Sequence, residues 1–211
     1  MNPAASELGP WLALAGLGAF HGLNPAMGWL FAVALGLHRH NRRLVWLSPL
    51  PIAFGHALSI AIVAALFLWA GLAINPRALR IGAGLFLIGW ALYHWRYGHR
   101  HRVRFGMQTG LAALVAWSFL MATTHGAGLM LLPVLMPLCF PVAPAPTLVS
   151  PFVTALLGIG IHTLAMLTVS TAIAVAVYEW IGLEILRHAW LNVDLIWTLA
   201  LLAAGALLLF G

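Results

Sequence analysis

The chain has 211 residues, of which 63% are hydrophobic and only 7% are charged, and its formal net charge is +6 at pH 7. Soluble domains carry about a quarter charged residues, and one globule of this length cannot bury so much apolar surface. The composition therefore excludes an ordinary soluble domain and predicts an all-α integral membrane protein. The single cysteine, Cys139, excludes a disulfide framework and a thiolate metal cage within one chain.

Six apolar runs follow one another along the chain, and each is close to or longer than the about 20 residues that a transmembrane helix needs. The first and the fourth run are long, and glycine and proline interrupt both of them. We predict six membrane-spanning helices, at residues 10–37, 47–72, 78–97, 108–138, 150–178 and 193–211.

Arginine is concentrated in the loops on one side of these spans. The loops after the first, third and fifth spans hold eight of the ten arginines, and an Arg/His cluster occupies 96–104. Because arginine-rich loops stay on the cytoplasmic side, both termini are expected outside the cytoplasm. Ten arginines without a lysine indicate a GC-rich bacterial genome and hence a bacterial cytoplasmic (inner) membrane. The expected partner is the lipid bilayer and not nucleic acid, and spans rich in glycine and alanine permit a homodimer.

The two halves of the chain resemble each other. A His-Gly pair begins at His21 and again at His125, and a His-x-Leu motif begins at His56 and again at His162. In both cases the copies are about 105 residues apart, which suggests duplication of a three-helix unit. A unit with an odd number of spans inserts its second copy upside down, as in the inverted repeats of many secondary transporters. The predicted repeats are residues 1–104, with the cytoplasmic Arg/His loop, and 105–211, within one membrane domain.

These four histidines are the candidate functional residues. Counting about 1.5 Å per residue from the span ends places all four near the middle of the bilayer, whereas His94 falls at the interfacial end of the third span. Ionisable groups at this depth usually serve a transport pathway or a cofactor. Neutral imidazole binds Zn, Cu, Ni, Co and Fe, and the sequence does not indicate which of these metals is bound. We predict one metal site formed by His21, His56, His125 and His162, with Asn24, Ser59, Thr124 and Thr163 as hydrogen-bonding neighbours.

Breaks in the helices accompany the histidines. Pro25 lies four residues after His21, so the carbonyl of His21 loses its helical donor. Freed backbone groups at membrane depth must be satisfied by protein or by a water-filled cavity. Polar side chains near the histidines, including Asn24 and Thr124, are candidates for that role.

The chemistry leaves more than one function open. The carboxylates Glu179, Glu184 and Asp194 lie in or near the last cytoplasmic loop and not inside the spans, and the chain has no HExxH and no GxSxG motif. Hydrolysis is therefore disfavoured and no catalytic residue is assigned. We expect a transporter of a transition-metal cation. One alternative is a haem-binding or metal-dependent membrane oxidoreductase that uses the same histidines. Another is a proton-coupled exporter of an amino acid or other small solute, in which the histidines relay protons.

Together with this architecture, the motifs HGLNP at 21–25 and GHAL at 55–58 resemble the lysine-exporter superfamily. Its members are small six-span proteins, many of them built as inverted repeats, and they include nickel/cobalt exporters and the thiol-redox transporters of cytochrome c maturation. The His-x4-Asp-His signature of the nickel/cobalt exporters and the paired cysteines of the redox branch are both absent. The resemblance implies transport, with metal cations as the match to histidines inside the membrane.

Overall fold

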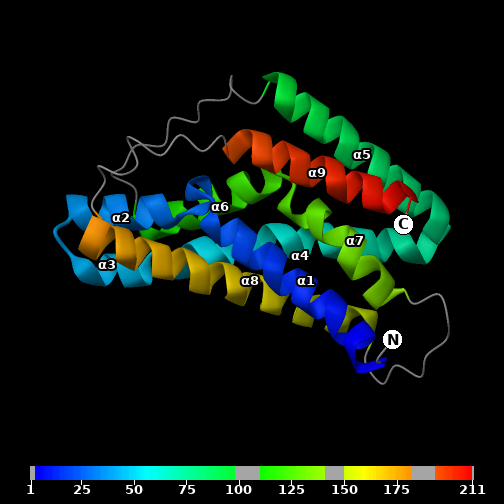
Figure 1. Ribbon diagram of the computed structural model, residues 1–211, viewed down its shortest axis with the longest axis horizontal. Coiled ribbons are helices and arrows are strands. Elements are labelled where there is room, and N and C mark those ends of the chain that lie inside the picture. The colour runs from blue at the N-terminus through cyan, green and yellow to red at the C-terminus, as the bar shows by residue number, and fades with distance from the viewer. Residues whose placement is uncertain (1–2, 98–109, 141–149, 182–192, 211) are drawn as a thin grey trace.

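The structure is a computed structural model that describes residues 3–97, 110–140, 150–181 and 193–210, and every element in these ranges is a helix (Figure 1). The elements are α1 (Pro3–Leu23), η1 (Pro25–Met27), α2 (Trp29–His38), α3 (Arg42–Leu47), α4 (Pro49–Ala73), α5 (Pro76–Tyr97), α6 (Leu111–Thr124), α7 (Ala127–Cys139), α8 (Pro151–Ala176), η3 (Val177–Ile181) and α9 (Val193–Phe210). The predicted apolar runs coincide with these helices to within about three residues, except that α1 begins at Pro3 and not at residue 10, and the short α3 was not predicted.

Within the described residues, fewer helices meet the requirements for crossing a membrane than the six that were predicted. Two continuous helical segments, Arg42–Gly71 and Pro151–Trp180, are long and apolar enough, and the bent pair of α6 and α7 makes a third if it counts as one span. Other described apolar helices are shorter, because the first predicted span is split into α1 and α2. The predicted cytoplasmic arginines Arg100, Arg102, Arg104 and Arg187 lie outside the described residues.

The first predicted span is broken just after His21. A residue before proline avoids helical backbone, and Pro25 has no N–H to donate, so α1 ends at Leu23 and a 3-10 turn follows. The backbone N–H of Asn24 donates instead to the carbonyl of His21, at 3.2 Å. The indole N–H of Trp29 donates to the carbonyl of Leu23, at 3.0 Å. The break therefore leaves both carbonyls bonded within the protein.

The fourth predicted span is also two helices. α6 and α7 meet at a bend of 65°, where Gly126 has a left-handed backbone conformation with φ of 69° that costs glycine little. Two tryptophans on other helices donate their indole N–H groups to carbonyls at this bend: Trp90 to Thr124 at 2.9 Å and Trp197 to His125 at 2.7 Å. Indole groups thus satisfy backbone at both breaks, a role that the sequence assigned to nearby hydroxyl and amide side chains.

Three pairs of helices run along one another: α1 with α8, α4 with α6, and α5 with α9 (Figure 1). All three pairs approach closely at a glycine, and in α5 and α9 these are Gly84 and Gly205. A Cβ atom added at Gly18 of α1 would overlap the carbonyl oxygen of His162 of α8, and one added at Gly55 of α4 would overlap the carbonyl oxygen of Val115 of α6. Small residues of this kind let helix backbones come together. α4 also packs on α8, so the first two pairs meet at that contact.

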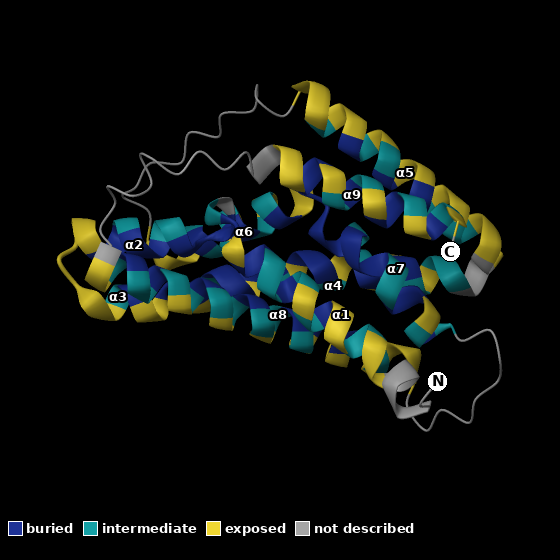
Figure 2. Cartoon of the chain, in the orientation of Figure 1, coloured by how far each residue is buried: buried dark blue, intermediate teal, exposed yellow. Residues whose placement is uncertain are grey.

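Buried residues lie where these pairs face one another, and exposed residues lie on the outer faces of the helices (Figure 2). Much of the exposed surface is apolar. Large hydrophobic side chains such as Phe54 and Leu66 of α4 and Leu164 of α8 are more than half exposed. The interior is also largely apolar, but histidine and serine side chains are buried within it, so part of the polar complement turns inwards while large hydrophobic side chains also cover the outside.

Candidate metal-binding site

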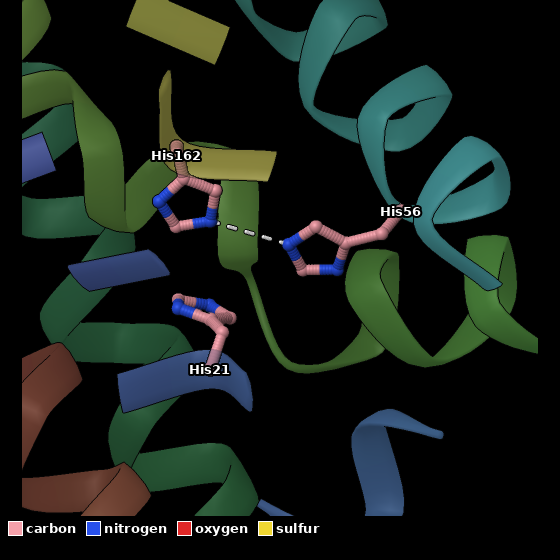
Figure 3. A group of neighbouring side chains, drawn as sticks. All are labelled: His21, His56 and His162. Carbon is pink, nitrogen blue, oxygen red and sulfur yellow. Dashed lines mark hydrogen bonds between the residues drawn. The ribbon is translucent and has the colours of Figure 1, made fainter. Parts of the chain in front are cut away.

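Three of the four candidate histidines meet in the interior. His21 comes from α1, His56 from α4 and His162 from α8, and each is 0% exposed. Their imidazole rings face one common space (Figure 3), and each ring offers a nitrogen within 4.8 Å of the nitrogens of the other two. Ring centroids are 4.8–5.5 Å apart. Residues far apart in the sequence therefore supply three metal-ligating atoms to one buried point.

Backbone carbonyls hold two of these rings. Nδ1 of His21 lies 2.7 Å from the carbonyl oxygen of Leu17, one turn earlier in α1. Nδ1 of His162 lies 3.3 Å from the carbonyl oxygen of Leu14, on the neighbouring helix. A carbonyl only accepts, so in both neutral rings Nδ1 carries the hydrogen and Nε2 carries the lone pair. Among the described residues, Nε2 of His21 has no hydrogen-bond partner. This tautomer is the one that a metal ligand requires.

The ring of His56, which no carbonyl of the described residues holds, faces the ring of His162. Nε2 of His56 lies 3.3 Å from Nε2 of His162. Because the lone pair of His162 is on that nitrogen, His56 donates its Nε2–H to His162 when no ion is bound. Nδ1 of His56 is then the acceptor, and it is buried without a hydrogen-bond partner in the described part of the chain. Buried polar atoms without partners are rare in proteins, and this group holds two of them within one cluster.

The spacing suits a transition-metal ion. Two imidazole nitrogens that bind one tetrahedral ion at about 2.1 Å are about 3.4 Å apart, and Nε2 of His56 and Nε2 of His162 are 3.3 Å apart. The remaining nitrogen, from His21, lies within the 4.8 Å that encloses the group. A shift of roughly an ångström in one side chain would complete a three-coordinate site.

His125 is not part of this group, although the sequence predicted a site of four histidines. It follows the last residue of α6, and its Nδ1 lies 2.9 Å from the carbonyl oxygen of Met121. Its ring centroid is 5.3 Å from that of His94 on α5. Instead of completing the buried trio, His125 packs at the bend between α6 and α7.

The predicted hydrogen-bonding neighbours occupy several different settings. Asn24 is buried at the break after α1. Ser59 shares a hydroxyl–hydroxyl hydrogen bond of 2.9 Å with Thr123. Thr124 is exposed and donates to the carbonyl of Met121. The hydroxyl of Thr163 is buried and has no hydrogen-bond partner in the described structure.

Trp197 of α9 belongs to the site and was not among the residues predicted from the sequence. It is buried, and its indole ring packs edge-on against both His21 (centroids 4.6 Å apart) and His125 (5.4 Å apart). Its position was the available signal, because tryptophan in membrane proteins is enriched at the interfaces and this one falls within an apolar run. His94 was likewise taken for an interfacial residue, and its ring contact with His125 was not foreseen.

No carboxylate is among the metal-ligating atoms that gather at this point in the described residues. Glu179 forms an ion pair with Arg42, at 2.6 Å, where η3 meets α3. The three ligands are therefore neutral imidazoles. A comparison of the chain with protein-family models, curated proteins and solved structures found no match, so its function has to be inferred from the geometry of this site.

Proposed function

We propose that the protein is a membrane transporter of a transition-metal cation, which it binds through His21, His56 and His162. The observation that carries the proposal is the convergence of three buried imidazoles from three helices, two of them fixed by carbonyls in the ligating tautomer. Imidazole is the commonest metal ligand in proteins. Ionisable side chains inside a membrane usually mark the path of a substrate or an ion.

The outer surface supports a membrane location. Leu164, Phe54 and Leu66 are 64%, 62% and 60% exposed on the two helices that are long enough to cross a bilayer. An apolar surface of this extent is unfavourable in water and favourable in lipid. Both termini lie at one end of the molecule, and the turn between α2 and α3 lies at the opposite end (Figure 1). This arrangement favours six spans with both termini on one side, outside the cytoplasm of a bacterium.

The helix pairing supports two inverted repeats, residues 1–104 and 105–211. His21 of α1 and His56 of α4 belong to the first repeat, while His125 at the end of α6 and His162 of α8 are their counterparts. α1 packs along α8 and α4 packs along α6, so the first helix of each repeat pairs with the second helix of the other. His56 and His162, which are counterparts, contact each other. Transporters with inverted repeats bind their substrates where the repeats meet.

The packing of the rings favours a bare ion over haem. A porphyrin needs an open slot beside its axial imidazole, but each ring of the trio packs against the other two at centroid distances of 4.8–5.5 Å. Trp197 covers a further face of the cluster at His21. Because the ligands are neutral, the cost of moving the ion's charge out of water is smallest for a monovalent ion such as Cu(I).

The test combines binding with transport. The full chain, purified in detergent, is dialysed against Zn²⁺ or Cu(I), and its metal content and visible spectrum are measured. We expect bound metal and no Soret band, with the tightly bound metal lost in His21→Ala, His56→Ala and His162→Ala and kept in His38→Ala, which changes an exposed histidine at the end of α2.

The same variants are then reconstituted into vesicles that contain a metal-sensitive dye. Wild type and His38→Ala should move the ion across the bilayer, and the three site variants should not. Metal binding without transport would mean that the protein holds the metal as a bound cofactor and does not carry it across the bilayer. A Soret band, or wild-type metal content equal to that of the three variants, would refute the metal-transport proposal.

A further inference from the structure

A second pair of histidines lies outside the buried trio. His125 follows α6 at the bend, where the carbonyl of Met121 orients its ring through Nδ1 at 2.9 Å. His94 lies in the last turn of α5, and the two ring centroids are 5.3 Å apart with the ring planes at 54°. The two imidazoles come from different helices and meet beside Gly126, the left-handed residue that ends α6. A pair of metal-ligating side chains is thus held in place by the helix break.

One side chain connects this pair to the trio. The buried indole of Trp197 packs edge-on against His21 of the trio and against His125 of the pair, at centroid distances of 4.6 Å and 5.4 Å. The indole N–H also donates to the carbonyl of His125 at 2.7 Å. One histidine from each group therefore packs against the same indole ring.

Burial falls from the trio to the pair. The three histidines of the trio are each 0% exposed and His125 is 9% exposed, while His94 is half-buried between the exposed side chains of Tyr93 and Trp95. The exposed fraction therefore increases from the trio to His125 and then to His94, towards the surface at the end of α5.

An open cavity of about 610 Å³ lies beside the same residues, between α4, α5, α6 and α7. Its walls include Trp90, one turn before His94, and Gly126, next to His125. They also include Ser59, one turn after His56, whose hydroxyl is bonded to that of Thr123. The cavity walls include no histidine of either group, but they contain close sequence neighbours of both, and their hydroxyl groups come from Ser59 on the helix that carries His56 and from Thr123 on α6.

We propose that His94 and His125 form a second, weaker site for the same cation, which the ion occupies on its way between the surface and the trio. The proposal rests on the metal-transport function proposed above. Two imidazoles bind a soft monovalent ion linearly, or a divalent ion that keeps several of its waters. A site with fewer protein ligands and more solvent holds the ion less tightly than three buried imidazoles. An ion that passes through it gives up its hydration in two steps instead of one.

The experiment counts bound ions in the full chain in detergent, by equilibrium dialysis over a range of concentrations. The probes are Zn²⁺ alone and Cu(I) alone under anaerobic, reducing conditions. The variants are His94→Ala and His125→Asn for the pair, His21→Ala for the trio, and His38→Ala as an exposed control. Asparagine at 125 keeps an amide N–H that can donate to the carbonyl of Met121, so the bend is preserved without a ligating ring nitrogen.

Wild type should bind two ions per chain, the second at least about tenfold more weakly, as expected for an incomplete ligand set. His94→Ala and His125→Asn should each lose the weaker ion and keep the tighter one, and their rate of transport into vesicles should fall severalfold. His21→Ala should lose the tighter ion and keep the weaker one. His38→Ala should resemble wild type.

The failures of the two proposals look different. A single ion in wild type that is lost in His21→Ala would overturn the second site and leave the trio intact. Two ions retained in both His94→Ala and His125→Asn would also overturn the second site. A tight ion retained in His21→Ala would overturn the proposed function at the trio instead.

Discussion

The helix break beside His21 and the helix break beside His125 begin with the same dipeptide and are built differently. Gly22 continues its helix, and a Cβ atom added to it would lie 2.7 Å from the carbonyl oxygen of Met166 on α8. Gly126 leaves the helical conformation with φ of 69°, and a Cβ atom added there would have only ordinary contacts, at 3.4 Å or more. Glycine thus provides close packing in the first half and a turn in the second. Similar sequence in the two halves of the chain need not mean the same physical role.

The largest effect is expected at Gly22. The added side chain of Gly22→Asn meets backbone atoms of α8 that cannot move aside, so unfolding should become easier by about 3 kcal/mol. Gly22→Ala should cost less, because its side chain is smaller. The measurement is the free energy of unfolding in mixed micelles titrated with SDS. Gly16→Asn, at an exposed glycine of the same helix with open space around it, is the matched control. A cost at Gly22 no greater than at Gly16 would contradict the close packing.

The next effect separates the two histidines that precede these glycines. His21→Ala removes one of three ligands, and the tighter binding constant should fall roughly a hundredfold, which corresponds to about 2.7 kcal/mol. His125→Asn should change that constant by less than about tenfold, because His125 lies outside the trio. Competition of the protein with a chromophoric chelator measures both. Equal losses in the two variants would restore the four-histidine site that the sequence predicted.

A smaller effect is expected at Gly126, where alanine should destabilise the protein more than asparagine does. In left-handed backbone the Cβ atom of alanine lies too close to the carbonyl oxygen, so Gly126→Ala should destabilise the protein by about 1–2 kcal/mol. Asparagine tolerates this conformation better, so Gly126→Asn should cost less than Gly126→Ala. At Gly22 the order of the two substitutions is the opposite, and the same unfolding titration records both. Gly89→Ala, at an open position within α5, should be neutral or slightly stabilising. The same order at 22 and 126 would remove the distinction between packing and turning.

The smallest effect concerns the indole at the bend. Trp90→Phe keeps most of the ring and removes the N–H that donates to the carbonyl of Thr124 at 2.9 Å. Hydrogen bonds between membrane helices contribute about 0.6 kcal/mol on average, so a loss of that size is expected in the unfolding titration. Trp69→Phe, at an exposed tryptophan of α4, should change nothing. Equal losses in the two variants would mean that the bond contributes nothing.

Much of the fold was available in the sequence because it depends on local properties. Long apolar runs gave the helix positions, and Pro25 gave the end of α1. The depth of each histidine followed from counting residues along a span, and that count placed all four at the same level. Depth does not give the direction in which a side chain points around its helix, and His125, beside the 65° bend between α6 and α7, is not among the three histidines whose ligand atoms come together.

The parts that the sequence did not reveal depend on distant segments. Trp197 donates to the carbonyl of His125 across 72 positions of the chain, and His94 meets His125 only because α5 packs beside the bend. A tryptophan within an apolar run has no local pattern that distinguishes an indole bonded to a backbone carbonyl from one that faces lipid. The number of helices that satisfy the span criteria was also overestimated, because residues 10–37 were counted as one helix and form α1 and α2.

The close approach at Gly18 has a mechanical consequence. α1 and α8 approach closely there, as α4 and α6 do at Gly55, and this packing would let each pair move as one rigid unit. His21 and His162 travel with the first unit and His56 travels with the second, which puts the 3.3 Å contact between His56 and His162 on the seam between the units. A cation held by all three rings would act as a latch across that seam. Rocking one unit against the other would pull a single ligand away and release the cation, and no helix would need to bend.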